Sequence, residues 1–398
     1  MIQNLLYLSP EFPRNYVQFI LQLRHRGVQV LGISGTRLED LPSDVRGGLV
    51  DYVQVPDLKD YRAVVDAARG LERRHGAIDR VESHCEHWLP LEAALREELG
   101  APGLDRCRTA FLRKKSSMKE IFGQAGVPVA RGRVARGLAE AQAFAAEVGY
   151  PLVLKPDIGV GAAGTYRADG PERLAEFFRG LAASPTFVEE FIAGDICTFD
   201  GLVDRDGQIV YCNSLTYSQG VMEVVNRDEH VFYYTAREIP ADLEGAGRLV
   251  VQAAGIRERF FHIEFFRTRT DRRIVGLEIN IRAPGGFTTD MWNYADDIDL
   301  YRGWARIVTG GSLGFEWCRR NHVLFVGRKD HIPYAHAHED VLARFRALLC
   351  HWDRLPDLFA RAMGNTGYLL RSDSLEELLQ AAAYVHAAPV LAISGSRD

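Results

Sequence analysis

Two alternating stretches decide the interpretation of this chain: Phe260-Phe261-His262-Ile263-Glu264-Phe265-Phe266 and Leu277-Glu278-Ile279-Asn280-Ile281-Arg282. Side chains two positions apart on a β-strand share a face. One face of the second stretch therefore carries Glu278, Asn280 and Arg282, and the other face carries apolar side chains. This alternation predicts two half-buried strands, each with one polar face.

A polar turn centred on Asp271 predicts that the two stretches form a hairpin. In that register Glu264 faces Glu278, and His262 faces Asn280. Opposed side chains have Cβ atoms about 5 Å apart, and like charges there repel each other, so this group needs a cation, a shared proton or a basic partner. Magnesium takes such oxygen ligands and keeps positions open for substrate phosphates. The alternative is a solvated strand face on which neighbouring arginines balance the acids.

Two further segments are typical of a nucleotide site. Residues 152–156, Leu-Val-Leu-Lys-Pro, end a strand at Lys155, and the glycine-rich residues 157–165 follow. Glycines let backbone amides approach phosphates, and lysine adds a compact charge, although only six of the 48 basic residues are lysines. Residues 187–195, Phe-Val-Glu-Glu-Phe-Ile-Ala-Gly-Asp, suit an adenine and a ribose. Taken singly, the glycine-rich loop is at least as typical of a plain turn, and residues 187–195 favour an edge strand with two solvated acids.

Around these segments the chain reads as a mixed α/β protein. The first hundred residues alternate strand and helix as βαβ units do. A basic helix is expected from Phe111 to Gln124, and Asp204-Arg205-Asp206-Gly207 is a strong hairpin signal. Further expected elements are the helices 241–254, 339–350 and 375–386 and the strands 323–326, 367–370 and 390–393.

Composition excludes several classes of function. A net charge of −5 over 398 residues gives no basic excess for a nucleic-acid binder. The first residues contain no positive leader, and no apolar run approaches the roughly 20 residues that a membrane span needs. A cytoplasmic protein without nucleic-acid or membrane partners is therefore expected. The stretch His84-Cys85-Glu86-His87-Trp88 contains metal-ligand residue types, but an ordinary loop at a domain interface is favoured over a zinc site.

The order of these segments resembles the ATP-grasp superfamily, in particular its carboxylate–amine ligase branch. The resemblance covers residues 1–310 and rests on Lys115-Ser116-Ser117-Met118-Lys119, Ala125-Gly126-Val127-Pro128, Lys155 with its loop, the 187–195 segment and the hairpin. It implies an α/β ATP-grasp fold with an N-terminal pre-ATP-grasp α/β domain, two α+β subdomains that clasp ATP and a C-terminal α+β extension. The corresponding ranges are 1–106, 107–188 (lysines and glycine-rich loop), 189–310 (hinge and metal-binding hairpin) and 311–398.

The resemblance also implies roles for individual residues. It implies ATP as a cofactor together with Mg²⁺, expected as two ions, with Mn²⁺ as an alternative. Lys114 stands where the family usually has an aspartate, so Lys114 and Lys115 both remain candidates for the first phosphate contact. Arg282 is implied to be catalytic, at the acyl phosphate and at the tetrahedral state that follows. The implied ATP-binding residues are Lys115, Lys155, Gly161, Glu189, Glu190, Phe191, Ile192 and Asp195. The implied metal ligands are Glu264, Glu278 and Asn280.

The implied reaction is ADP-forming amide or peptide bond formation through an acyl phosphate, on an amino acid or a related small acid. The expected partners are a small carboxylate and an amine, and the resemblance allows a homodimer. Residues 157–165 and 217–234 are candidate lids that keep water away from the intermediate. Two alternatives stay open: an ATP-grasp carboxylase or other acyl-phosphate-forming enzyme with a different nucleophile, and an ATP-binding module without turnover.

Overall fold

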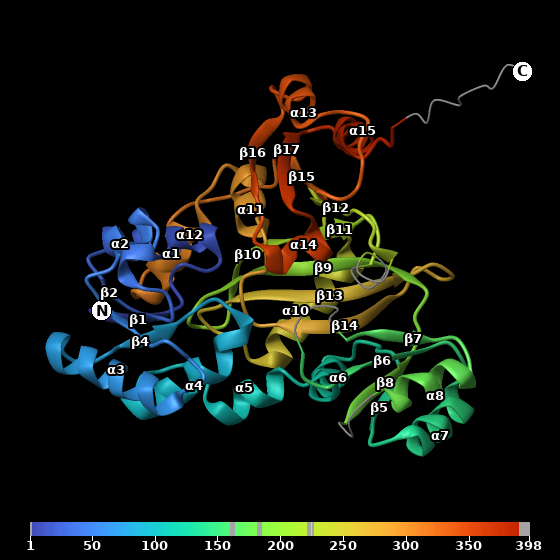
Figure 1. The fold of residues 1–398 in the computed structure, drawn as a ribbon, viewed down its shortest axis with the longest axis horizontal. Coiled ribbons are helices and arrows are strands. Elements are labelled where there is room, and N and C mark those ends of the chain that lie inside the picture. The colour runs from blue at the N-terminus through green and yellow to red at the C-terminus, as the bar shows by residue number, and fades with distance from the viewer. Residues whose placement is uncertain (1, 160–163, 181–184, 221–223, 225–226, 390–398) are drawn as a thin grey trace, which may run out of the picture.

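The hairpin of residues 260–282 forms one edge of the largest β-sheet among the described residues (Figure 1). The computed structural model describes all residues except 1, 160–163, 181–184, 221–223, 225–226 and 390–398. Within these described residues the strands form three sheets, which have four, nine and four strands. The expected strand 390–393 lies outside the described residues.

The N-terminal sheet is parallel, with the strand order β3-β2-β1-β4. All five residues of β1 are buried, as the apolar run from Leu5 to Leu8 predicts for a parallel strand covered on both faces. This agrees with the βαβ alternation expected from the sequence. Its elements are β1 (Asn4–Leu8), η1 (Arg14–Tyr16), α1 (Val17–His25), β2 (Gln29–Ser34), η2 (Leu38–Asp40), α2 (Ser43–Gly48), β3 (Asp51–Gln54), α3 (Tyr61–His75), β4 (Arg80–Glu82), η3 (Glu86–Trp88) and α4 (Leu89–Leu99).

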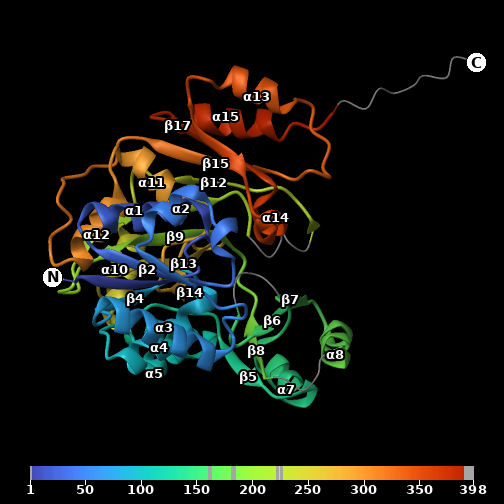
Figure 2. The same ribbon diagram turned by 60° about the vertical axis from the view of Figure 1, so that its left-hand side comes forward.

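The smaller antiparallel sheet has the order β5-β8-β6-β7 and lies apart from the N-terminal sheet, with α7 and α8 on its outer side (Figures 1 and 2). Leu152, Leu154 and Val188 pack with these helices in one apolar cluster. The opposite face of β6 and β8 is consequently left for polar side chains. The elements are α5 (Arg106–Leu112), α6 (Lys115–Gln124), β5 (Gly132–Ala135), α7 (Leu138–Val148), β6 (Leu152–Pro156), β7 (Tyr166–Ala168), α8 (Pro171–Arg179) and β8 (Thr186–Glu190).

The central sheet runs β14-β13-β9-β11-β12-β15-β17-β16, and β10 pairs with β9. The strands after residue 311 continue this sheet, which rises toward the C-terminal helices in Figure 1. The elements are β9 (Gly194–Val203), β10 (Ile209–Asn213), β11 (Leu215–Tyr217), β12 (Phe232–Thr235), α10 (Ala241–Ala254), β13 (Phe260–Thr268), β14 (Ile274–Asn280), α11 (Thr288–Asp296), α12 (Leu300–Val308), β15 (His322–Arg328), α13 (His338–Arg344), β16 (Leu349–Arg354), α14 (Asp357–Met363), β17 (Thr366–Ser372) and α15 (Leu375–Val385).

The predicted hairpin register is confirmed. His262 pairs with Asn280, and Glu264 pairs with Glu278. The pairing then shifts at a β-bulge, since Phe265 faces Gly276. A side chain at Gly276 would overlap the ring of Phe122, so the bulge places a glycine where α6 packs closest to β14. The centre of symmetry on Asp271 therefore holds only for the open end of the hairpin.

Two expected helices are wrong in their extent. The predicted helix from Phe111 to Gln124 is two helices, α5 and α6. The second begins at Lys115 because the Asp157 side chain accepts hydrogen bonds from Ser116 N and Oγ, at 2.8 and 2.9 Å, which caps a new helix there. The predicted helix 339–350 ends at Arg344, and Leu349–Arg354 instead pairs with β17 as an edge strand.

A buried carboxyl between β10 and α11 predicts a pH dependence of stability. Burial raises the pKa of Asp296 from 3.8 to about 6, and Tyr211 Oη donates to it at 2.8 Å. Between pH 4 and 6 the folded chain therefore holds a proton on Asp296 that the unfolded chain releases. The free energy of unfolding consequently falls as pH rises from 4 to 6. We expect Asp296→Asn to abolish this fall in the free energy of unfolding, which is on the order of 3 kcal/mol at pH 7. Urea unfolding of both chains between pH 4.5 and 7.5 measures it, and equal slopes with pH would contradict it.

Candidate active site

The predicted pair of facing carboxylates lies on the face of β9, β13 and β14 opposite the apolar face that packs on α10 and α6. Asp200, on β9, faces His262 across the strand pair, and its Oδ1 lies 2.8 Å from His262 Nδ1. His262 Nε2 lies 3.1 Å from Glu264 Oε1. Burial opposes protonation of this imidazole, but the two carboxylates outweigh it and raise the pKa of His262 to about 10. Glu264 thus already has one cationic neighbour.

The electrostatic surroundings of Glu278 differ from those of Glu264. Burial raises the pKa of the Glu278 carboxyl, Lys115 counteracts this, and Glu264 raises it further. Asn280 is buried on the same face, whereas Glu264 and Glu278 are only partly covered. Two carboxylates and an amide thus face an open side of the sheet, and the negative charge of the two carboxylates is only partly balanced by neighbouring cations. These oxygen donors fit a hard divalent cation, which would remove the repulsion between the carboxylates.

Lys119 of α6 and two charged side chains of the small antiparallel sheet form a second cluster. Lys155 on β6 and Glu189 on β8 share the polar face of their sheet, because Lys155 pairs with Phe187, two residues before Glu189. Glu189 Oε1 lies 2.5 Å from Lys155 Nζ, and Glu189 Oε2 lies 2.9 Å from Lys119 Nζ. Burial alone would raise the pKa of Glu189, but the two ammonium groups lower it to about 2. The cluster presents a net positive charge.

The structure places Lys115, and not Lys114, close enough to Glu278 to lower the pKa of its carboxyl. Lys115 is the first residue of α6 and is buried, with its Nζ donating to Gly159 O at 3.3 Å, while Lys114 is exposed. Lys119 lies one helical turn later on the same face, so α6 directs two lysines toward one place. Lys115 and Lys155 both stabilise the ionised form of Glu278, which brings the lysines and the hairpin into one electrostatic unit.

Arg282 follows β14 and reaches the N-terminal domain. Its Nη2 and Nε donate to Glu86 Oε2 at 2.7 and 3.1 Å. The loop 84–88 is therefore a domain-interface loop, as the sequence favours, and one of its side chains meets the proposed catalytic arginine. Arg282 and Lys155 both lower the pKa of Glu264, and Lys115 and Lys155 both lower that of Glu278. The expected catalytic arginine, the metal ligands and the two predicted lysines therefore border one region.

The predicted hinge residues form the connection between the two antiparallel sheets. Their side chains contact separate partners and do not gather in one cluster. The Glu190 carboxylate pairs with Arg131 at 2.7 Å, and Phe191 stacks under Arg167, whose Cζ lies 4.3 Å from the ring centre. Ile192 lies half-buried in the connection itself. Asp195 is exposed and lies 3.1 Å from Arg269 on the hairpin turn. Gly161 lies outside the described residues, and so do parts of both candidate lids.

Sequence reasoning missed the roles of three charged residues at this site. Lys119 had a signal, its spacing of four residues from Lys115 on one helix. His262 shared a predicted face with Glu264, but its partner Asp200 comes from a strand sixty residues earlier. Glu86 had no local signal, because its partner Arg282 is 196 residues away. Contacts of this kind depend on how the sheets pack.

Residues 148–290 match a protein-family profile described as an ATP-grasp domain. The L-arginine-specific L-amino acid ligase of Bacillus subtilis is 25% identical over 245 residues, 57% of this chain. The chain spans only 59% of the length of that relative. In the described part of the chain, no helix combines the length and the apolar character that crossing a membrane requires.

Two solved structures share the fold. The L-amino acid ligase from Bacillus licheniformis superposes with a TM-score of 0.75 at 19% identity, over 96% of both chains. The biotin carboxylase domain of 2-oxoglutarate carboxylase from Hydrogenobacter thermophilus, crystallised with MgADP, ADP and bicarbonate, gives a TM-score of 0.69 at 16% identity. The second superposition covers 97% of this chain and 89% of the other. At these identities the likeness establishes the architecture, an ATP-grasp fold over nearly the whole chain.

Proposed function

We propose that the chain belongs to the ATP-grasp superfamily and, from the site described above, that it is an ADP-forming carboxylate–amine ligase. The proposed acid is an amino acid or a related small acid, activated as an acyl phosphate. The observation that carries the proposal is the meeting of three sets of groups: the Glu264 and Glu278 carboxylates, the cationic cluster around Lys155, and Arg282. Phosphoryl transfer to an acid needs these charges in one place.

The first proposed step transfers the γ-phosphoryl group of ATP to an oxygen of the substrate carboxylate. Lys115 and Lys155 would neutralise charge on the phosphate oxygens, because their ammonium groups border the same region. Glu189 would hold Lys155 and Lys119 in place, since it is buried between them. The bond that breaks joins the γ-phosphorus to its bridging oxygen, and ADP leaves.

The second proposed step is attack of an amine on the acyl phosphate. A tetrahedral state with a charged oxygen forms, and phosphate then leaves as the amide forms. Arg282 would donate to that oxygen, because its guanidinium is held by Glu86 and by Ala283 O at 2.9 Å. Glu264, Glu278 and Asn280 would hold Mg²⁺, which when bound supplies positive charge to the phosphates.

The test of this proposal is ADP release with Mg²⁺ and ATP across a panel of the twenty L-amino acids, singly and in pairs. A ligase releases ADP and phosphate in equal amounts and forms a dipeptide that mass spectrometry detects. A separate arm with bicarbonate tests the carboxylase alternative, which the bicarbonate-bound neighbour keeps in view. ADP release with bicarbonate alone would overturn the ligase, and absence of turnover in every arm would favour an ATP-binding module.

The choice between the two neighbouring lysines gives a matched pair of variants. We expect Lys115→Met to raise the KM for ATP by about 10- to 100-fold, the effect of losing one hydrogen bond to a charged group. Lys114→Met should change it by less than about twofold, because that side chain is exposed. Initial rates of ADP release at varied ATP measure both. A larger effect for Lys114→Met would reverse the assignment.

A further inference from the structure

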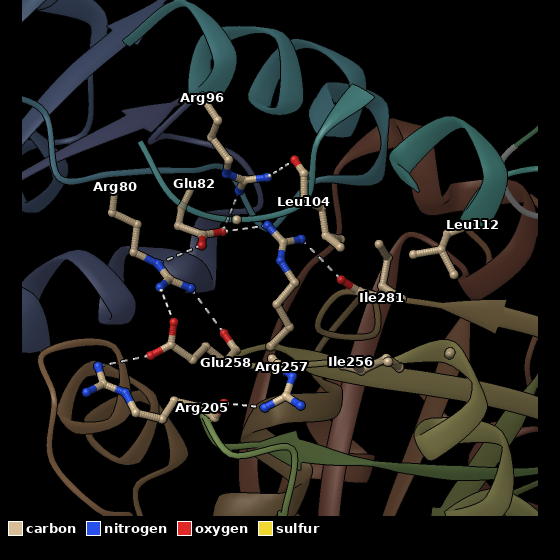
Figure 3. Close-up of a pocket in the computed structure, with 14 residues that line it drawn as sticks. Arg80, Glu82, Arg96, Leu104, Leu112, Arg205, Ile256, Arg257, Glu258 and Ile281 are labelled. Atoms are coloured by element: carbon tan, nitrogen blue, oxygen red, sulfur yellow. Dashed lines mark hydrogen bonds and ion pairs between the residues drawn. The ribbon is translucent and has the colours of Figure 1, made fainter. Parts of the chain in front are cut away.

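A pocket of about 300 Å³ lies where the N-terminal domain meets the central sheet (Figure 3). Residues of β4 and α4 line it on one side, and residues 254–259 line it on the other. Ile281 also lines it, with its side chain in the apolar cluster beneath the hairpin. Asn280 and Arg282, the neighbours of Ile281, belong to the opposite face. The pocket is therefore separate from the proposed reaction centre, and its volume is at the lower end of the range for small-molecule sites.

Arginine side chains give this pocket a positive charge. Two glutamates, Glu82 and Glu258, also line it, and the fully buried Glu92 accepts hydrogen bonds from two of the arginines. Five guanidinium groups and three carboxylates leave a net charge of +2. The arginines are Arg80, Arg96, Arg205, Arg257 and Arg259.

The buried part of this cluster lacks an anionic partner. Arg96 is 3% exposed, and among the described residues its Nε has no hydrogen-bond partner. Gly103 leaves space beside this atom, since a Cβ at that position would come within 2.8 Å of Arg96 Nε. Burial lowers the pKa of Arg96, and the charges of Arg259 and Arg80 lower it further, although Glu92 and Glu82 oppose the shift. A buried donor thus borders the pocket without a protein acceptor.

Two exposed arginines border the solvent side of the pocket. Arg257 donates through Nη1 alone, to Arg205 O at 2.8 Å. The guanidinium of Arg205 has a single contact, 3.4 Å from Nη2 to Glu258 Oε1. In the part of the chain that the structure describes, the other N–H groups of both side chains have no protein partner. Guanidinium groups with free N–H edges bind phosphate oxygens through paired hydrogen bonds.

The remaining wall of the pocket is apolar. Figure 3 shows the charged side chains gathered on one side and the aliphatic side chains on the other, which are Leu104, Leu112, Ile256 and Ile281. Leu112 and Ile256 belong to the same apolar cluster as Ile281. An inorganic anion would leave this wall in contact with water, whereas an apolar group attached to the anion would cover it.

We propose that this pocket binds an organic phosphate, with its dianionic phosphate group among the arginines and its apolar part against Leu104, Leu112 and Ile256. A phosphate monoester carries a charge of about −1.5 to −2 at pH 7, which balances the +2 of the cluster. A carboxylate or a sulfate ester carries one charge and balances half of it. Arg96 belongs to the N-terminal domain and Arg257 to the central sheet segment, so the ligand links the two domains across their interface.

The experiment is isothermal titration calorimetry of the full-length chain with three probes at constant ionic strength: phenyl phosphate, phenyl sulfate and inorganic phosphate. Phenyl sulfate keeps the shape of phenyl phosphate and removes one charge. Inorganic phosphate keeps the charge and removes the apolar group. We expect phenyl phosphate to bind at least about tenfold more tightly than either, because each of the other two probes loses one of the two sets of contacts.

Variants locate the binding. Arg205→Gln combined with Arg257→Gln removes two exposed charges of the pocket and should weaken phenyl phosphate binding by about 10- to 100-fold. The matched control is Arg173→Gln, because Arg173 is 59% exposed, against 58% for Arg205, and also pairs with a glutamate. Lys115→Met alters the proposed ATP site instead. Both controls should leave the affinity for phenyl phosphate within about twofold of that of the wild type.

Several results would overturn the inference. On the wild-type chain these are the absence of phenyl phosphate binding, equal affinity for phenyl sulfate, which contradicts a site for a dianion, and equal affinity for inorganic phosphate, which contradicts an organic ligand. Unchanged binding in the double arginine variant would place the ligand elsewhere, and loss of binding in Lys115→Met would place it in the ATP site. None of these measurements requires turnover, so they are independent of the proposed reaction.

Discussion

Replacing Glu278 by glutamine should lower kcat for acid-dependent ADP release by about 100- to 1000-fold, the usual effect of removing a group that organises charge at a reaction centre. The chain should remain folded and be no less stable. Burial and Glu264 raise the pKa of the Glu278 carboxyl, so its ionised form is destabilised in the absence of a cation. Glutamine keeps the shape and removes the repulsion.

The measurement is a coupled ADP assay at increasing Mg²⁺, with thermal unfolding of the same samples. Asp271→Asn is the matched control, because it makes the same chemical change at the exposed turn of the same hairpin and should leave kcat within about twofold. Wild-type activity in Glu278→Gln would show that the metal assignment is wrong. A large loss of stability would instead assign Glu278 a structural role.

Replacing Glu92 by alanine should lower the free energy of unfolding by about 3–5 kcal/mol, as expected when one partner of a buried ion pair is removed. Glu92 is fully buried on α4. Its Oε2 lies 2.6 Å from Arg96 Nη2 and 2.7 Å from Arg259 Nη2, and its Oε1 accepts from Ser83. The substitution leaves two buried guanidinium groups with fewer partners and removes the acceptor that holds the Ser83 backbone.

Glu97→Ala is the control for this prediction. Glu97 is on the same helix and pairs with Arg106, but its side chain is 43% exposed, so its loss should cost no more than about 0.5 kcal/mol. Thermal and urea unfolding of both variants compare them. Since Ser83 precedes the loop with Glu86, Glu92→Ala should also reduce activity. Equal stabilities of the two variants would contradict the assignment of the Glu92 network as a support of the domain interface.

Much of the fold could be predicted because its signals are local. Alternation along 260–282 predicted the strands and their polar face, and the turn centred on Asp271 predicted the pairing of Glu264 with Glu278. A slip of one residue would have turned the polar side chains of one strand toward the core. The helix 241–254 matches α10 in both bounds. The helix break before Lys115 could not be predicted, because the residue that caps it, Asp157, is some forty positions away.

The sequence by itself therefore determined the strands, the polar face of the hairpin and the residue types that suit a nucleotide and a divalent cation. These depend on the period of hydrophobicity and on side-chain chemistry, which are properties of neighbouring residues. The tertiary structure decided which charges meet: Lys119 with Glu189, Asp200 with His262, and Glu86 with Arg282. The physical reason is that an ion pair acts over a few ångströms of space, whatever the separation along the chain.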